Sequence, residues 1–327
     1  MKSTAKKKLF INNMITLGMV VAAWIIMEVL MGTGHVSSLL KGLLVPFCIY
    51  VIMAVSLNLT VGILGELSLG HAGFMCVGAF AGALFSKCMK GTLNPTVSLV
   101  IAIFIGAAVA AVFGILIGIP VLRLRGDYLA IVTLAFGEII KELVTCLIVG
   151  HDENGLHILF NLTGNKTVED LGLSDTGIAI IKGAQGTASV KTIASFTAGF
   201  ILVMVTLFIV LNLKHSRAGR AIMALRDNRI ATSSIGINTT KYKLMAFVTS
   251  AALAGAAGAL YGLNYSSLQA AKFNFNTSIL VLVFVVLGGL GNIWGSIVAT
   301  VVLYVLPEAL RQFSDYRMLV YAIVLIL

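Results

Sequence analysis

The chain contains 327 residues, of which 59% are hydrophobic and only 11% are charged. Soluble domains carry roughly 25% charged residues, so this composition excludes a water-soluble fold and predicts a polytopic membrane protein. The formal net charge of +10 is then a topology signal, because the cytoplasmic loops of membrane proteins are enriched in Lys and Arg. We therefore expect a lipid bilayer to surround the chain and no nucleic acid to bind it.

The apolar segments predict an all-α bundle of about eight to nine transmembrane spans, some of them discontinuous, within a single domain over residues 1–327. Four lysines among the first eight residues predict a cytoplasmic N-terminus. The first span is expected over 15–31. A cleaved signal peptide is disfavoured, because Glu28, Met31 and His35 make a poor small-residue cleavage site. Further spans are expected over 42–63, 67–85, 96–119, 128–149, 196–213, 244–265 and 278–306.

The last of these spans is interrupted at residues 288–295 by the sequence GGLGNIWG. Glycine and asparagine at mid-depth are typical of the discontinuous helices of transporters. Pro307 and Glu308 are expected to follow on the cytoplasmic side. The apolar run 318–327 is too short to cross a bilayer, so we expect the sequence to stop within a ninth helix.

A second interruption lies in residues 58–73, where polar side chains and helix-weakening glycines occur at membrane depth. Irregular backbone survives there only where protein buries it or water lines it, so we expect a broken helix or a close backbone crossing. Two interpretations remain open: the stretch lines a translocation pathway, or it forms a sharp cytoplasmic turn with Glu66 and His71 at the interface. Its candidate pathway residues are Asn58, Glu66, Ser68 and His71.

The expected span 128–149 carries three charges, Glu138, Lys141 and Glu142, on one helical face near its middle. Each charge at a helix centre costs about 2.5–3.5 kcal/mol on insertion scales, so the three need partners or water. A structural ion pair between Glu138 and Lys141, spaced i, i+3, is favoured. Lining of the pathway by these two residues and contact with a partner subunit are the alternatives. The pattern neither supports nor excludes a proton relay.

Residues 150–195 form a long polar stretch with five acids and three lysines. The span count places this stretch on the extracytoplasmic side. Its glycines predict irregular structure with one short helix. Docking of an extracytoplasmic partner and a plain surface loop are the two interpretations.

Residues 214–243 form a polar segment between two apolar spans, and the positive-inside rule places it in the cytoplasm. Over 213–243 the formal charge is +6, from seven cations and Asp227. Apolar residues at helical spacing predict short amphipathic helices, which Gly219 and Gly236 punctuate. A loop that merely turned the chain would not need such helices, so we expect the segment to present a surface to a cytoplasmic partner.

Motifs for nucleotide binding, nucleophilic catalysis and metal binding are absent from the sequence. There is no phosphate-binding loop of the form GxxxxGK followed by Ser or Thr, and neither HExxH nor GxSxG occurs. The five histidines do not cluster at metal-ligand spacing, and the four cysteines form no CxxC pair. We therefore expect no metal, no cofactor and no enzymatic activity, and an ATP-driven function would require a separate subunit.

Four stretches of the sequence carry a family resemblance: residues 57–82, RLRGDYLAIVTLAFGEII at 123–140, SRAGRAIMALRDN at 216–228, and VLGGLGNIWGSIV before Leu-Pro-Glu. In this order they resemble the permeases of bacterial branched-chain amino-acid ABC importers, most of all the M-type member of the two-permease pair. The resemblance spans nearly the whole chain. It implies a multi-pass protein of the bacterial cytoplasmic membrane, with a second related permease, two ABC ATPase subunits and an extracytoplasmic substrate-binding protein as partners.

The resemblance also implies a mechanism. ATP binding would close the two ATPases, and the cytoplasmic segment would transmit this movement as a rigid-body shift that alternates access to a pathway between the permeases. Arg220 and Arg226 would anchor the ATPase contact, and Asp227 would orient it by pairing with a basic neighbour. The alternative for each arginine is a charge that only sets the topology by the positive-inside rule. The residues that match the family's ATPase-coupling loop are Gly219, Arg220, Ala224, Arg226, Asp227, Asn228 and Gly236.

The resemblance leaves other functions open. Leucine, isoleucine or valine is the implied substrate, and urea, a sugar or another small polar molecule is the alternative within the same permease class. The stretch after Gly150 departs from the family's glycine-rich pattern, so docking and substrate cannot be assigned from it. An ion-coupled secondary transporter would need Glu138, Lys141 or Glu142 as its ion site. A membrane-embedded enzyme would need catalytic groups clustered at one depth, and the sequence has none.

Overall fold

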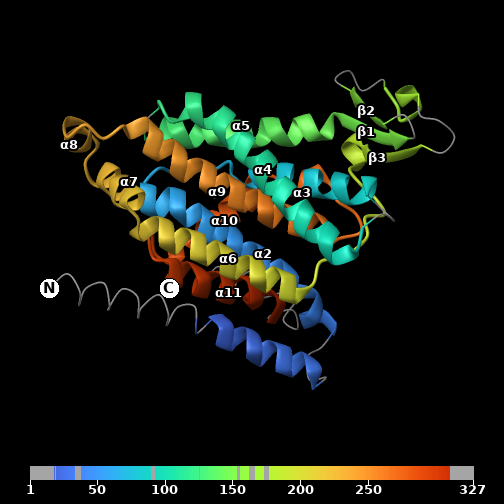
Figure 1. Cartoon of the computed structure of the whole chain (residues 1–327), viewed down its shortest axis with the longest axis horizontal. Helices are drawn as coiled ribbons and strands as arrows, with labels where there is room; N and C mark the ends of the chain where they lie inside the picture. The colour runs from blue at the N-terminus through green and yellow to red at the C-terminus, as the bar shows by residue number, and fades with distance from the viewer. Residues whose placement is uncertain are drawn as a thin grey trace.

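The computed structural model describes residues 18, 20–33, 38–89, 93–124, 126–152, 155–161, 166–172 and 177–309. Long helices lie side by side in one bundle, and a small sheet projects at one end (Figure 1). Five helices of the described part are long and apolar enough to cross a membrane: Leu40–Leu64, Pro95–Val121, Phe196–His215, Thr239–Gly262 and Ala270–Leu287. The expected helical bundle is therefore confirmed, while the expected count of eight to nine spans stays a prediction.

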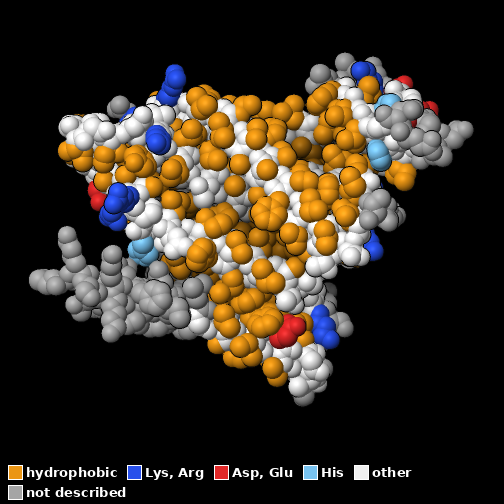
Figure 2. Space-filling view, viewed as in Figure 1, with side chains coloured by type: hydrophobic (Ala, Val, Ile, Leu, Met, Phe, Trp, Pro, Cys, Tyr) orange, Lys and Arg blue, Asp and Glu red, His pale blue; other side chains and the backbone are white. Residues whose placement is uncertain are grey.

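The helices are numbered as in Figure 1. An apolar helix over Val20–Gly32 comes first, and its Trp24 stacks on Phe200 of the later helix α6 (Phe196–His215) with 5.1 Å between ring centroids. Hydrophobic side chains cover most of the visible face of the bundle, and charged side chains are sparse on it (Figure 2). The later helices are α2 (Ser38–Asn58), α3 (His71–Cys88), α4 (Pro95–Val121), α5 (Asp127–Thr145), α6 (Phe196–His215), α7 (Arg217–Asp227), α8 (Arg229–Ser234), α9 (Thr239–Gly262), α10 (Phe275–Leu287) and α11 (Ile293–Ala309).

Helix α9 packs against α2, α3 and α4. Small residues let these backbones approach closely, as is usual between membrane helices. A Cβ built on Gly78 of α3 would lie 2.1 Å from the Gly255 carbonyl oxygen, and one on Gly258 would lie 2.0 Å from the Met75 carbonyl oxygen. The alanine- and glycine-rich sequence of α9 therefore permits close helix packing.

Helix α2 ends in a π-helical turn, η1 (Leu59–Leu64). Gly65 then adopts a left-handed φ of 79°, and the chain continues to α3 without regular structure. This connection crosses α5 closely, because a Cβ on Gly70 would lie 2.0 Å from the Thr133 carbonyl oxygen. The predicted broken helix with a close backbone crossing is therefore confirmed.

The expected eighth span over 278–306 is instead two separate helices, α10 and α11. A Cβ on Gly288 would lie 2.4 Å from the Gly295 carbonyl carbon, whereas residues seven apart in one helix are separated by about 10 Å along its axis. The left-handed φ values of Gly289 and Gly291, 91° and 81°, make this sharp turn. The glycines thus reverse the chain instead of interrupting one straight helix.

Helix α11 runs back along α2. Its Ser296 hydrogen-bonds with Asn58 at the broken end of α2, and its Tyr304 packs on Tyr50, two turns earlier in α2, with 5.0 Å between ring centroids. Pro307 therefore lies toward the opposite end of α2 from Asn58. Pro307 and the basic segment 214–243 thus lie at opposite ends of the bundle, so they do not share one side of the membrane as the sequence analysis expected.

A three-stranded antiparallel sheet occupies part of the stretch 150–195, where the sequence predicted irregular structure. Strand β1 (Leu147–Asp152) lies between β2 (Gly155–Phe160) and β3 (Ile178–Lys182). Leu147 faces Phe160 in one ladder, and Ile148 faces Lys182 in the other. The prediction of irregular structure for this region is thus wrong over the three strands.

The expected span 128–149 ends earlier than predicted, because α5 stops at Thr145 and β1 starts at Leu147. An apolar strand and the end of an apolar helix have similar sequences over so few residues. Two short 3-10 turns, η2 (Glu169–Leu171) and η3 (Gly183–Gln185), are the helical structure of the described part of this stretch.

Three expectations fall outside the described residues. They concern the lysines among the first eight residues, the start of the first span, and the apolar run 318–327.

Candidate coupling surface and pathway residues

Helix α7 is capped by Ser216, whose hydroxyl accepts a hydrogen bond from the Gly219 amide at 3.0 Å. Such a cap stabilises a helix by about 1 kcal/mol. A side chain at Gly219 would collide with the end of α6, because its Cβ would lie 2.0 Å from the Leu213 carbonyl oxygen. Ile222 and Leu225 are buried. The amphipathic helix expected here is therefore confirmed. The close contact of Gly219 with the end of α6 fixes the direction of α7 relative to α6.

Helix α8 is held on the end of α7 by local hydrogen bonds. The Asn228 side chain accepts a hydrogen bond from the Ala231 amide at 3.0 Å and so caps α8. The Thr232 hydroxyl donates to the carbonyl oxygens of Ala224, at 2.9 Å, and Asn228, at 2.7 Å. Gly236 has a φ of 81° and lets the chain turn back towards α9. These contacts make α7 and α8 one structural unit.

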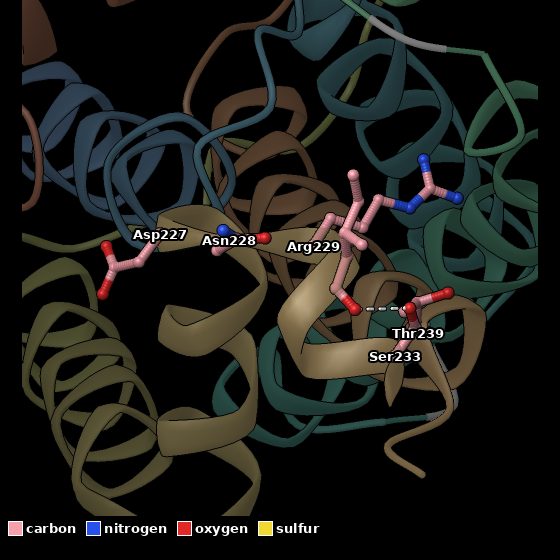
Figure 3. A pocket seen from close by; sticks show the side chains of 6 residues that line it. Asp227, Asn228, Arg229, Ser233 and Thr239 are labelled. Atoms are coloured by element: carbon pink, nitrogen blue, oxygen red, sulfur yellow. Dashed lines mark hydrogen bonds between the residues drawn. The ribbon is translucent and has the colours of Figure 1, made fainter. Parts of the chain in front are cut away.

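The tip of this unit exposes two large apolar side chains. Ile230 is 78% exposed and Ile235 is 74% exposed. The Ser233 hydroxyl donates to the Ile230 carbonyl oxygen at 2.8 Å (Figure 3). Two apolar side chains this exposed on an otherwise polar segment are available for contact with a partner. An open pocket of about 570 Å³ beside them is lined by Asp227, Asn228, Arg229, Ile230, Ser233 and Thr239.

Arg226 reaches from α7 to the broken end of α2. Its Nη1 donates to the Gly62 carbonyl oxygen at 2.9 Å, and its Nη2 lies 3.2 Å from Asp227 Oδ1. Its aliphatic part fills the space above Gly65, where a Cβ would lie 2.4 Å from Arg226 Cγ. The expected pairing of Asp227 with a basic neighbour is present. The contact with α2 was not foreseen, because nothing in the local sequence indicates it.

Two more cations of the basic segment bind backbone carbonyl oxygens. Lys214 Nζ donates to the Gly291 carbonyl oxygen, in the turn between α10 and α11, at 3.0 Å. Arg220 Nη1 lies 3.3 Å from the His215 carbonyl oxygen. Lys214 therefore links the end of α6 to a distant turn, whereas the contact of Arg220 is local.

Lys243 and Glu66 form a buried ion pair between the first turns of α9 and the segment that follows α2. Their side chains are 5% and 15% exposed. Removing a charge from water costs several kcal/mol unless a partner compensates it, so each residue explains the burial of the other. The sequence analysis counted Lys243 among the basic segment. Its position at the start of an apolar span was the signal that it needs a partner.

Asn58 is fully buried and connects α2 to the turn between α10 and α11. Its Nδ2 donates to the Asn292 carbonyl oxygen at 3.1 Å and to Ser296 Oγ at 2.7 Å. Its Oδ1 accepts a hydrogen bond from the Gly291 amide at 2.8 Å. The backbones cross so closely that a Cβ on Gly62 would lie 2.1 Å from the Gly291 nitrogen.

His71 and Ser68 are enclosed by protein. His71 is 2% exposed, and its Nε2 lies 2.8 Å from Ser56 Oγ. The Ser68 hydroxyl is also buried, and it finds no hydrogen-bond partner within the described part of the chain.

Glu138, Lys141 and Glu142 lie together on α5. Lys141 forms an ion pair with Glu138, and its Nζ lies 3.3 Å from Glu142 Oε1. Glu138 also accepts a hydrogen bond from the Phe275 amide, at the start of α10, at 3.0 Å. The favoured structural ion pair is therefore confirmed, and it additionally connects α5 to α10.

The structure thus gathers only some of the candidate residues. Asn58, Glu66 and Arg226 meet around the broken end of α2, while Glu138 and Lys141 bind each other on α5. Contacts that the sequence analysis missed come from Ser56, Lys214, Lys243, Gly291 and Ser296. Within the described residues, no group of three or more His, Cys, Asp or Glu side chains is arranged to hold a metal ion.

Comparison with known proteins identifies relatives over nearly the whole chain. The model of the family described as "Branched-chain amino acid transport system / permease component" matches residues 39–327. The chain is 38% identical over 324 residues to the high-affinity branched-chain amino acid transport system permease protein LivM of Escherichia coli (strain K12), covering 97% of this chain and 72% of that protein. No solved structure matches it.

More distant relatives carry related names. The permease protein LivH of Salmonella typhimurium is 27% identical over 268 residues, or 80% of this chain and 82% of LivH. The permease protein BraD of Pseudomonas aeruginosa is 26% identical over 273 residues, or 82% of this chain and 84% of BraD. The family match and the long apolar helices together identify a multi-pass membrane protein, and the chain belongs to the family of branched-chain amino acid transport system permease components.

Proposed function

We propose that this chain is a membrane-spanning permease subunit of an ABC importer that carries leucine, isoleucine or valine across the bacterial cytoplasmic membrane. Its partners are a second related permease, two ABC ATPases and an extracytoplasmic substrate-binding protein. The names of its relatives support the substrate class. The N-terminus and residues 214–243 lie in the cytoplasm, and residues 150–195 lie on the other side, as the positive-inside rule favours.

The observation that carries this proposal is the construction of the α7–α8 unit. The unit lies at the end of the bundle away from the sheet (Figure 1) and exposes Ile230 and Ile235. It is also bonded to a transmembrane helix through Arg226. A surface that offers apolar side chains outward and is tied inward to the bundle suits an ATPase contact. The residues of this contact are Gly219, Arg220, Ala224, Arg226, Asp227, Asn228 and Gly236.

The pathway in this proposal follows the broken end of α2. Burying an unpaired hydroxyl costs about 1–3 kcal/mol. The Ser68 hydroxyl has no partner among the described residues, which supports a position beside water or substrate. Asn58, Glu66 and His71 belong to the same stretch and remain pathway candidates. Glu138 and Lys141 act at the flank of the pathway, as the pair that fastens α5 to α10.

Deletion of the chain in its native host tests the proposed function. Uptake of radiolabelled leucine should fall and should return when a tagged copy is supplied. Purification through the tag in mild detergent should recover two ATPases and a second permease. Uptake that persists without the ATPases and collapses with the proton gradient would identify an ion-coupled transporter instead. Recovery of the ATPases with uptake of urea or a sugar would overturn the substrate assignment.

The exposed tip of α8 gives a second test. Ile230→Ser should weaken recovery of the ATPases, because it removes apolar area from the proposed contact, while leaving folding intact since the side chain is 78% exposed. Ile178→Ser is the matched control, at a position on β3 that is 61% exposed. Equal recovery of the ATPases with both variants would show that α8 is not part of the contact.

A further inference from the structure

Two irregular backbone segments cross at the end of the bundle that carries α7. One is the π-helical end of α2, and the other is the turn between α10 and α11. They touch at Gly62 and Gly291, where a Cβ on Gly62 would lie 2.1 Å from the Gly291 nitrogen and 1.9 Å from Asn58 Oδ1. Side-chain hydrogen bonds from Asn58 fasten the crossing. Any widening of this end of the bundle between α2 and the turn must separate these two segments.

Each of the two segments is held from outside the crossing by one cation. Arg226 donates to the Gly62 carbonyl oxygen at 2.9 Å, and Lys214 donates to the Gly291 carbonyl oxygen at 3.0 Å. The Gly62 carbonyl lies at the C-terminal end of a helix, where the last carbonyl groups lack intrahelical partners and carry partial negative charge, so it suits a cationic donor. Lys214 lies in the last turn of α6 and Arg226 in the last turn of α7, and Ser216 joins the two helices. A movement of α7 therefore acts on residues 59–65 directly, through Arg226, and on residues 288–292 through the end of α6.

We propose that the crossing of residues 59–65 with residues 288–292 is the cytoplasmic gate of the pathway, and that Arg226 and Lys214 are the positioning residues that transmit the movement of α7 to it. The inference rests on the proposed function, in which α7 and α8 receive that movement from the ATPases. The inference gives Arg226 a second role: besides its place in the ATPase contact, it holds residues 59–65 of the membrane domain.

The neighbouring contacts fit a gate that opens and closes. Arg226 is 42% exposed at its side chain and keeps Asp227 as a partner when it leaves Gly62, so release does not bury an unpaired charge. The buried pair of Glu66 with Lys243 lies directly beyond the crossing. Breaking such a pair costs several kcal/mol, so it acts as a fixed point and confines the movement to the segment before it. Gly65, with its φ of 79°, provides the joint between them.

The first experiment separates transmission from ATPase binding. Lys214→Gln removes one positive charge and the contact with Gly291, at a residue outside the proposed ATPase contact. Lys241→Gln removes one positive charge from an exposed site of the same segment. In the purified importer complex, Lys214→Gln should retain the ATPases and hydrolyse ATP, while leucine uptake in proteoliposomes falls about fivefold or more. Lys241→Gln should behave as wild type. Unchanged uptake with Lys214→Gln, or loss of the ATPases from the complex, would overturn the inference.

The second experiment does not depend on the transported substrate. Hydrogen–deuterium exchange in residues 59–65 and 288–292 should change when a non-hydrolysable ATP analogue binds the wild-type complex. The change should be absent in the double variant Lys214→Gln/Arg226→Gln. A response in both complexes, or in neither, would contradict the inference. A wild-type complex that shows the response but does not carry leucine would instead refute the proposed substrate and leave the gate in place.

A third comparison uses the glycine at the crossing. Gly62→Ala should hold the two segments apart and lower leucine uptake, whereas Gly42→Ala in the same helix has nothing within 4 Å of its Cβ and should leave uptake unchanged. Equal uptake with the two variants would show that the crossing need not close.

Discussion

Lys243 and Glu66 join parts of the chain that are 177 residues apart. Replacing one partner leaves the other charge buried, which costs about 3–5 kcal/mol. We therefore expect Lys243→Met to lower the thermal unfolding midpoint of the purified chain in detergent by a large amount. The double variant Glu66→Gln/Lys243→Met should unfold at a higher temperature than the single variant, because it buries no unpaired charge.

The outcome of this comparison is decisive for the ion pair. A single variant as stable as the wild type would mean that water reaches Lys243 in the membrane protein. Lys241→Met serves as the control, since its side chain is exposed two residues away. It should leave the unfolding midpoint nearly unchanged.

Sequence patterns located most of these residues but not their partners. A buried asparagine beside glycines marked Asn58 as unusual, and a carboxylate at membrane depth marked Glu66. The partners Gly291 and Lys243 lie more than 170 residues away along the chain. Periodicity and spacing report on neighbours within one element, so they contain no information on which distant groups satisfy a buried polar atom. For the same reason the inward direction of Arg226 could not be foreseen.

At the scale of the elements, close packing depends on positions where even a methyl group is excluded. Gly78→Ala would place a Cβ 2.1 Å from the Gly255 carbonyl oxygen and should destabilise the α3–α9 contact by about 1–3 kcal/mol. Gly42→Ala, in a helix position with open space, should stay within about 1 kcal/mol of the wild type. The measurement is the unfolding midpoint of each purified variant in the same detergent. Similar midpoints would contradict the packing described for α9.

Helix α8 is too short to be stable without its cap and its contacts with α7. Asn228→Ala removes the hydrogen bond to the Ala231 amide, which typically costs about 0.5–2 kcal/mol. We expect faster hydrogen exchange at Ala231 and Thr232 and weaker recovery of the ATPases. Asn274→Ala removes the corresponding cap of α10 and should leave the recovery of the ATPases unchanged. The prediction fails if the two cap variants lose the ATPases to the same extent.

Some secondary-structure elements could be predicted from sequence patterns and others could not. The amphipathic period of residues 217–227 predicted α7, since one face is apolar and the other charged over three turns. The run LIVGHD did not distinguish β1 from the end of a span, because its apolar part, Leu147–Val149, is short and shows no alternation with polar residues. The glycines of residues 288–295 marked an irregular segment, but glycine permits both a break within one helix and a reversal between two. Contact between Gly288 and Gly295 decides between them.

At the scale of the whole molecule, the charged residues define two opposite ends, and this gives a topology prediction. In whole cells, a cysteine introduced at Lys182 on the sheet should react with a membrane-impermeant maleimide, and one at Lys241 should react only after the cells are opened. Both side chains are exposed, so access from each side of the membrane decides the result. Labelling of position 241 in intact cells would reverse the proposed orientation.

The general architecture was accessible from composition, because 59% hydrophobic residues with 11% charged residues leave few soluble folds. The exact number of crossings was not, because several helices are short, charged or broken. Helix α5 carries Glu138, Lys141 and Glu142 in its interior, and α11 is a shorter apolar helix. Hydropathy alone cannot decide how such helices sit in a bilayer. Their polar groups are stabilised by partners on other helices, and a hydropathy profile contains no information on those partners.

Cys146 is the single residue between the end of α5 and the start of β1. So short a connection leaves no slack, and a rotation of α5 about its axis must turn the sheet with it. In the proposed orientation the sheet lies on the extracytoplasmic side. A fluorophore placed on β2 would then report rearrangements of α5, and a single-domain antibody bound to β2 and β3 would restrain α5 without entering the cytoplasm.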